Sequence, residues 1–265
     1  MTTEIETYLN SLSENILTLN ISGKCKGIES LPDLKRFKNL QKLSCSNNQL
    51  SSLSTLPQNL EELFCSNNKF TSLPTLPQNL KILNCYNNQL TSLPTLPQNL
   101  RELSCSKNQL TSLPTLPQNL EILHCSNNQL TSLPTLPQNL EELFCSNNQL
   151  TSLPTLPQNL KILNCYNNQL TSLPTLPQNL RELSCSNNPI YEIVNNYSLI
   201  KIEQNIQTLN DFRHLYYCLK FKKQLRKWLW EKVREHNAKK RYSPMYLIEN
   251  LGEDDDLDTV LDNWQ

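Results

Sequence analysis

The chain has 265 residues, and its 24 Lys and Arg residues balance 24 Asp and Glu, so the formal net charge is zero. Only three residues are glycine, which excludes the glycine-rich loops that bind phosphate groups. No apolar run approaches the roughly 18 residues of a membrane-spanning helix. Ten cysteines are too few for a secreted disulfide scaffold, in which about 8–10% of residues are cysteine.

The first segment, MTTEIETYLNSLSENILTLN, has neither a basic start nor a continuous apolar stretch. We therefore expect no signal peptide and a reducing cytosolic environment, in which thiols stay reduced. Residues 1–24 are interpreted as an N-terminal cap and a divergent entry to the first coil of a repeat. The core of this entry should comprise Ile16, Leu19, Ile21, Ile28, Leu31 and Leu40. Its return segment is longer and more tolerant of helix than those that follow.

A repeat of twenty residues occupies positions 25–194 and reads L-x-x-L-x-C-x-x-N-x-L-x-x-L-P-x-L-P-x-N. Its first half alternates apolar and polar residues with period two, which predicts a short strand. Its second half has two prolines in four residues, which disfavour helix and predict an extended or polyproline-like return. One such coil cannot bury enough apolar surface to fold alone, so the coils must stack.

The stretch LPTLPQNLEELFCSNNQLTSLP resembles the leucine-rich repeat in its short bacterial variety. The resemblance covers about residues 16–194. It implies an α/β-type solenoid, a right-handed curved superhelix that is mostly strand and extended return. A parallel sheet would line its concave side, and a helical cap would close its C-terminal end.

Cysteine recurs every twenty residues at an inward strand position, from Cys45 to Cys185. A linear ladder of sulfurs offers no tetrahedral convergence for zinc, whereas disulfides between successive coils are geometrically conceivable. In a reducing cytosol we favour a third interpretation, in which the thiols are small buried hydrophobes. Ile21 takes this position in the entry coil, and Cys25 falls outside the column. A parallel column of asparagines, from Asn48 to Asn188, should satisfy backbone groups where the strands end.

Residues 61–107 match residues 141–187 except at Lys69, Phe70 and Lys107, which indicates duplication of a four-coil block. Duplication extends a surface and does not improve a single catalytic centre. The outward strand positions are the candidates for binding, because aromatic residues are enriched in binding hot spots. The predicted partner-binding residues of the concave face are Phe64, Ile82, Tyr86, Ile122, His124, Phe144, Ile162 and Tyr166. The alternative is that these residues are a passive surface copied with the template.

No catalytic, metal-binding or cofactor-binding residue is predicted. His124 is the single histidine of the repeat region and has no outward Asp or Cys beside it. We interpret it as a solvated histidine.

Residues 195–265 lose the repeat. Phe221, Leu225, Leu229 and Val233 follow i, i+4 spacing, which predicts an amphipathic helix. Ten basic residues against two acidic ones between Cys218 and Arg241 give a net charge of +8, and residues 249–262 have seven acidic residues and no basic one. The favoured interpretation is a C-terminal cap with a basic helix and an acidic end. The alternative is that residues 219–241 bind a membrane or nucleic acid.

Residues 219–264, from FKKQLRKWLWEKVREHN onward, are similar to the C-terminal tail of mimivirus-like giant-virus proteins. The similarity rests mainly on Arg226-Lys227-Trp228-Leu229-Trp230-Glu231. It implies a viral protein that acts in the cytoplasm of an infected host, and it implies no chemistry.

The sequence thus predicts a monomeric, non-catalytic module that binds a host or viral protein on its concave face and needs no cofactor. One alternative is an adaptor whose basic helix contacts a membrane or nucleic acid. A weaker one follows from the resemblance, because some bacterial effectors with this repeat type carry a ubiquitin-ligase domain with a nucleophilic cysteine. Here the region after the repeat is short, and its one cysteine, Cys218, lies in the apolar sector of the predicted helix.

Overall fold

The structure is a computed structural model that describes residues 4–25 and 28–190. The chain divides into two compact units, residues 1–207 and 208–265. All described residues belong to the first unit. The C-terminal cap, the basic segment 219–241 and the acidic end lie outside the described residues, as does Cys218. The domain limits at residues 24 and 194 stay predictions.

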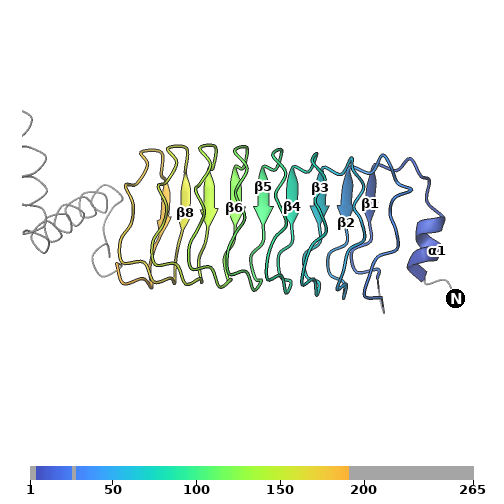
Figure 1. Ribbon diagram of the computed structural model, residues 1–265, viewed down its shortest axis with the longest axis horizontal. Helices are drawn as coiled ribbons and strands as arrows, with labels where there is room; N and C mark the ends of the chain where they lie inside the picture. The colour runs from blue at the N-terminus through green and yellow to red at the C-terminus, as the bar shows by residue number, and fades with distance from the viewer. Residues whose placement is uncertain (1–3, 26–27, 191–265) are drawn as a thin grey trace, which may run out of the picture. The chain divides into compact units, whose positions relative to one another are not determined.

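The first unit is a solenoid in which each coil contributes one short strand (Figure 1). A helix, α1 (Glu4–Asn10), precedes the strands β1 (Thr18–Asn20), β2 (Lys42–Ser44), β3 (Glu62–Phe64), β4 (Ile82–Asn84), β5 (Glu102–Ser104), β6 (Ile122–His124), β7 (Glu142–Phe144), β8 (Ile162–Asn164) and β9 (Glu182–Ser184). Within the described ranges these nine strands form one sheet in sequence order, and neighbouring strands are parallel. The predicted solenoid with a parallel sheet is confirmed.

Each strand is three residues long, and β1 to β8 show the predicted alternation, whereas the central Leu183 of β9 is only half-buried. In β3, for example, the central Leu63 is buried and the residues on either side are half-buried. The register advances by one repeat per strand, so Leu63 lies opposite Leu83, and Leu83 lies opposite Leu103. Identical repeat positions therefore form straight columns across the sheet, with leucines inside and variable residues outside.

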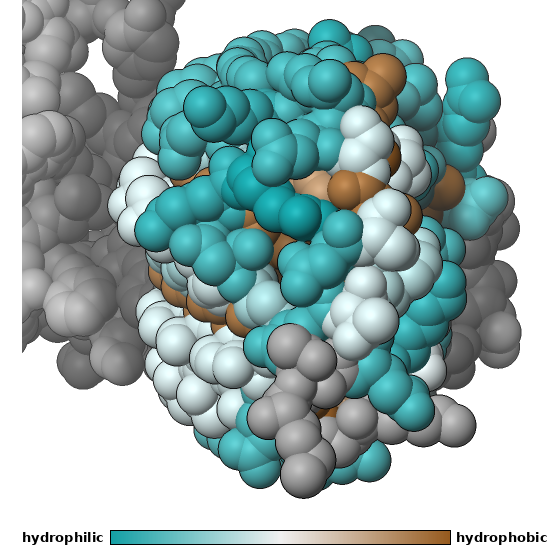
Figure 2. Space-filling model, turned by 90° about the vertical axis from the view of Figure 1, so that its right-hand side faces the viewer, coloured by the Kyte–Doolittle hydropathy of each residue, from teal (hydrophilic) through white to brown (hydrophobic). Residues whose placement is uncertain are grey.

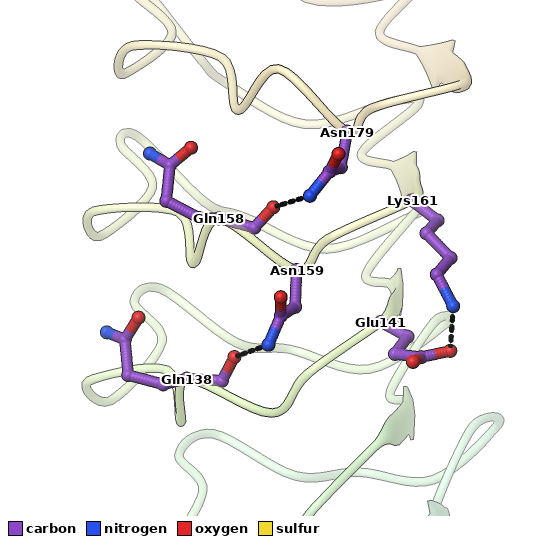
Figure 3. A network of polar contacts seen from close by, with 6 residues as sticks. All are labelled: Gln138, Glu141, Gln158, Asn159, Lys161 and Asn179. Atoms are coloured by element: carbon purple, nitrogen blue, oxygen red, sulfur yellow. Dashed lines mark hydrogen bonds and ion pairs between the residues drawn. The ribbon is translucent and has the colours of Figure 1, made fainter.

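The proline-containing half of the coil forms neither helix nor strand, as predicted. Residues 74–77 are an example. It ends in a turn, in which Leu80 N–H donates to the carbonyl oxygen of Pro77 at 3.2 Å. The asparagine of the turn also bonds to the preceding coil. Asn159 Nδ2 donates to the carbonyl oxygen of Gln138 at 3.0 Å, as Figure 3 shows. No role was predicted for this asparagine, whose amide joins successive coils at the turn that precedes the strand.

Helix α1 lies at the N-terminal end of the solenoid (Figure 1). Ile5 and Leu9, four residues apart and therefore on one helix face, are buried. The guanidinium group of Arg36 donates to the carbonyl oxygen of Leu9 and so ties the helix to the return segment of the entry coil. Seen from this end, the described surface is mostly hydrophilic or neutral, with only small apolar areas (Figure 2).

In the entry coil, Ile21 and Cys25 occupy two different positions of the repeat. Ile21 N–H donates to the carbonyl oxygen of Ser44 at 2.8 Å, the same bond that Cys45 makes one coil later, so Ile21 occupies the cysteine position as predicted. Cys25 is also buried. Its N–H donates to Oδ1 of Asn48 at 2.9 Å, which is how the repeat leucines bond in the following coils. Cys25 therefore replaces a repeat leucine.

Two residues assigned to the core of the entry coil are only partly inside it. Ile16 and Ile28 are half-buried, and Leu34 and Phe37, which the repeat pattern did not single out, are fully buried instead. No helix occurs over residues 28–40. The longer return of this coil is filled by an aromatic ring rather than by helix.

Candidate protein-binding face of the sheet

The cysteine ladder is part of the hydrophobic core. Each cysteine in the described residues is a free thiol, and each is at most 6% exposed. Burial raises the pKa of Cys85 and of Cys145 to about 12. Because the thiolate is the nucleophilic and metal-binding form, these thiols are chemically inert at neutral pH. The described residues contain no group of three or more His, Cys, Asp and Glu side chains that could hold a metal ion.

The asparagine ladder bridges the coils as predicted. Asn148 is typical, because its Nδ2 donates to the carbonyl oxygens of Cys125 and Cys145 at 3.1 Å each. Its Oδ1 accepts from Leu130 N–H at 3.0 Å. One side chain thus satisfies buried backbone groups of two successive coils.

A second asparagine column was not recognised in the sequence. It directly precedes the first and has positive φ angles between 53° and 57°, in the left-handed region that asparagine tolerates better than most residues. Asn67 Nδ2 donates to Asn47 Oδ1 at 2.9 Å, and Asn167 repeats the bond to Asn147 at 2.8 Å. Lys107 takes this position in one coil, also with φ of 54°, and supplies a charge where the others supply an amide. The signal was present in the sequence as the doubled Asn-Asn of nearly every coil.

The outward positions form what we call the strand face, namely the first and third residues of each strand and the residue two positions further on. All eight predicted binding residues lie on it, in columns fixed by the strand register. They fall into two copies of one arrangement, the first patch (Phe64, Ile82 and Tyr86) and the second patch (Phe144, Ile162 and Tyr166). Ile122 and His124 lie on β6, beside the second patch. Seven of the eight are half-buried, and Tyr166 alone is classed as exposed, at 36%.

In the first patch, lysines cover both aromatic rings. Lys42 Nζ lies 2.7 Å from Glu62 Oε2 and 5.0 Å from the ring centroid of Phe64. Lys107 Nζ lies 5.3 Å from the ring centroid of Tyr86. Both lysines are within the distance of about 6 Å at which a cation is attracted to an aromatic face.

In the second patch, Ile122 stands at the position of Lys42 and Asn187 at the position of Lys107, and the His124 ring lies beside Phe144. The His124 ring packs edge-on against Phe144, with centroids 4.5 Å apart and an interplanar angle of 75°. Asn187 Nδ2 donates to the hydroxyl oxygen of Tyr166 at 2.8 Å. The same two aromatic residues are therefore neighboured by uncharged groups.

The prediction that His124 is a solvated histidine is wrong. Its Nε2 is buried and has no hydrogen-bond partner among the described residues. Burial lowers the pKa of His124, and the nearby carboxylates of Glu142 and Glu102 offset this only in part. The large Phe144 side chain on the next strand packs edge-on against the imidazole ring. This contact between strands cannot be inferred from the His124 position alone.

Several other charges of this region pair along one edge of the strand face. Lys161 Nζ contacts Glu141 Oε2 at 2.6 Å (Figure 3), and Lys81 makes the corresponding contact with Glu61 at 2.6 Å. Such exposed pairs contribute only about 0–1 kcal/mol. These pairs therefore add little to the stability of the fold.

Comparison with known proteins identifies the family to which this repeat architecture belongs. The family model described as Leucine Rich repeats (2 copies) matches residues 58–98, 98–138 and 138–178. Comparison with curated proteins gives no significant match. Among solved structures, YopM from Yersinia enterocolitica WA-314 is 41% identical with a TM-score of 0.65, over 67% of this chain and 39% of that one. The functional domain of InlJ from Listeria monocytogenes, described as including a cysteine ladder, is 32% identical with a TM-score of 0.57, over 65% of this chain and 40% of that one.

The stacked parallel strands, the leucine core and the asparagine ladder define a repeat protein whose variable residues are presented on one sheet. More narrowly, this chain is a leucine-rich repeat protein. Proteins of this family are typically non-catalytic scaffolds that bind other proteins. The matched part spans about two fifths of the Yersinia and Listeria chains. Within the described residues, no helix is long and apolar enough to cross a bilayer.

Proposed function

We propose that this chain is a non-catalytic interaction module that binds a protein partner on the strand face through the two patches, Ile122 and His124. The observation that carries the proposal is the duplication of the patches. The inward columns of leucine, cysteine and asparagine are committed to packing and hydrogen bonding. Apart from the core residue Phe70, the side chains that differ between the coils of residues 61–187 are outward, and the outward aromatic residues recur together with the block.

The relatives support the same class of function. A YopM structure from Yersinia pestis, 39% identical with a TM-score of 0.54 over 62% of this chain, is described as a leucine-rich effector protein. We propose that this chain is likewise an effector and that it acts on a protein of another organism. The tail similarity of residues 219–264 favours a viral protein that acts on host or viral partners in the cytoplasm of the host, as a monomer.

The test is capture of a partner from host lysate by the purified chain, with identification by mass spectrometry and then binding to the purified partner. Phe144→Glu and Tyr166→Glu should each weaken binding at least tenfold without an appreciable change in melting temperature, because both side chains are at the surface. Thr155→Glu, on the exposed return side, is the matched control and should leave binding unchanged. If binding survives both substitutions and the equivalent ones at Phe64 and Tyr86, the strand face is not the binding surface.

The second candidate function is a tether, and the net charge of +8 between Cys218 and Arg241 favours it. In this proposal residues 219–241 contact an anionic membrane or nucleic acid. Binding to anionic vesicles or DNA should then weaken as salt rises and disappear when the basic residues are neutralised. Binding that is insensitive to salt would contradict it.

A further inference from the structure

In both patches the phenylalanine shares its strand with a glutamate at the same position. The two patches differ in the residues of the strand before. Glu62 and Phe64 are the first and third residues of β3, and Glu142 and Phe144 are the first and third residues of β7. The preceding strand differs, because it begins with Lys42 in one copy and with Ile122 in the other. The duplication therefore provides an internal comparison of one site with and without a lysine.

The first copy shows what this site binds. The Lys42 ammonium group contacts the Glu62 carboxylate at 2.7 Å and lies over the Phe64 ring at 5.0 Å. A carboxylate beside an aromatic face is a suitable environment for a cation, since both attract positive charge. The side chains of Lys42 and Glu62 are 45% and 33% exposed, so the site is at the surface.

The second copy lacks that cation. Ile122 has no charge, and Glu142 has Ile162 as its neighbour on the other side. Two basic residues of the edge column, Arg101 and Lys161, are directed to Glu121 and Glu141. Among the described residues, no salt bridge to Glu142 is present. His124 packs on Phe144 without supplying a full charge, because burial favours its neutral form.

We propose that Glu142 and Phe144, with His124 beside them, bind a lysine or arginine side chain of the partner protein, in the way that Glu62 and Phe64 bind Lys42. This inference rests on the proposed function, since it names the chemistry by which the strand face recognises a protein. It also makes the two patches unequal. The first is closed by the chain's own lysine, and the second is open to a cation from outside.

The test uses two short probes and the full chain. The first probe is a tripeptide, acetyl-isoleucyl-lysyl-isoleucine amide, and the second has norleucine in place of lysine, which removes the ammonium group and keeps the alkyl chain. Titration at neutral pH is followed by NMR through the ring signals of His124 and Phe144. The lysine probe should bind at least tenfold more tightly than the norleucine probe, and the ring signals of Phe64 should stay unchanged.

Two opposite substitutions give matched controls. Ile122→Lys supplies an internal cation to Glu142 and should weaken binding of the lysine probe at least tenfold. Lys42→Ile opens the first copy, so the ring signals of Phe64 should begin to respond to the same probe. Glu142→Gln, which keeps the side-chain shape, should weaken binding as Ile122→Lys does, and it guards against an effect of misfolding.

Equal binding of the two probes, no binding of either, or unchanged affinity in both Ile122→Lys and Glu142→Gln would overturn the inference. These outcomes are separable from failure of the proposed function. If partner capture still depends on Phe144 and Tyr166 while the lysine probe shows no preference, the strand face binds protein but this cation site does not exist.

Discussion

The two duplicated blocks have nearly the same sequence, and the structure gives them nearly the same interior, with Phe70 in one and Leu150 in the other as the exception, but a different surface. Inside, Asn68 and Asn148 make the same set of bonds with the same geometry to within 0.1 Å, for example 3.2 Å and 3.1 Å to the cysteine carbonyl of their own coil. Outside, the first patch is bordered by Lys42 and Lys107, whereas the second is bordered by His124 and Asn187.

The difference arises at the borders of the blocks. In a solenoid each coil contacts only its neighbours, so a copied coil keeps its core contacts wherever its neighbours follow the repeat. Its outward side chains meet whatever the adjacent coil presents. Lys42 belongs to the coil before the first block, and its counterpart before the second block is Ile122. Duplication therefore preserves stability while allowing the binding properties of the copies to diverge.

The largest expected effect is a loss of stability when an asparagine of the ladder is removed, and it should be equal in the two blocks. Asn68→Ala and Asn148→Ala should each lower the free energy of unfolding by about 3 kcal/mol, because a buried leucine N–H and several buried carbonyls lose their partner. Urea denaturation followed by circular dichroism measures this. Gln149→Ala, at an exposed side chain, should change stability by less than about 0.5 kcal/mol.

A difference of more than about 1 kcal/mol between the two asparagine variants would show that the blocks are not equivalent inside. Two values close to that of the glutamine control would show that the ladder does not stabilise the coils.

The next effect concerns the thiols and has a defined direction with pH. Burial raises the pKa of Cys145 from 9.0 to about 12 and that of Cys65 well above 9.0. Their contribution to stability is therefore complete below about pH 9 and is lost as the pH rises toward 12, because the unfolded chain releases these protons first. Each thiol should account for up to about 1.4 kcal/mol per pH unit in this window.

Cys65→Val and Cys145→Val should each reduce the alkaline loss of stability, measured by urea denaturation at pH 8 and pH 10, and by similar amounts. Alanine at the same position is a control for volume, since it removes the thiol without filling its space. An unchanged pH dependence in all these variants would mean that the sulfurs are accessible to solvent.

The repeat pattern predicted the solenoid because every core position recurs at a fixed interval and each coil meets a copy of itself. It placed the eight predicted binding residues on one face for the same reason, since the strand register keeps equivalent positions aligned. It failed where a residue depends on something outside the pattern. Cys25 replaces a leucine because the entry coil is longer, and Phe37 fills space that the later coils do not have.

The borders of the patches could not be predicted either, for a geometric reason. Whether Lys42 reaches the Phe64 ring depends on side-chain length and rotamer, which the alternation of inward and outward positions does not specify. His124 was expected to be solvated because its own column and coil show no partner. Its burial comes from Phe144 on the next strand.

The smallest expected effect is the pH dependence of stability that His124 adds to the second patch. Its pKa is lowered mainly by burial, and Glu102 on β5 and Glu142 on β7 act in the opposite direction. A lowered pKa in the folded state means that the unfolded chain takes up the proton first as pH falls. Folding should thus be less favourable at pH 5 than at pH 7, by an amount that solvent screening at this half-exposed side chain keeps small.

His124→Ser gives the matched control, because serine stands at the equivalent position in the coil before the first block, at Ser44. The substitution should remove this part of the pH dependence, measured as the change in unfolding midpoint between pH 7 and pH 5, and NMR titration of the imidazole should give a pKa below 6.5 in the native protein. A titration above 6.5 would mean that the two carboxylates outweigh burial. The second patch would then carry its own cation at neutral pH, and the difference between the blocks would be one of degree.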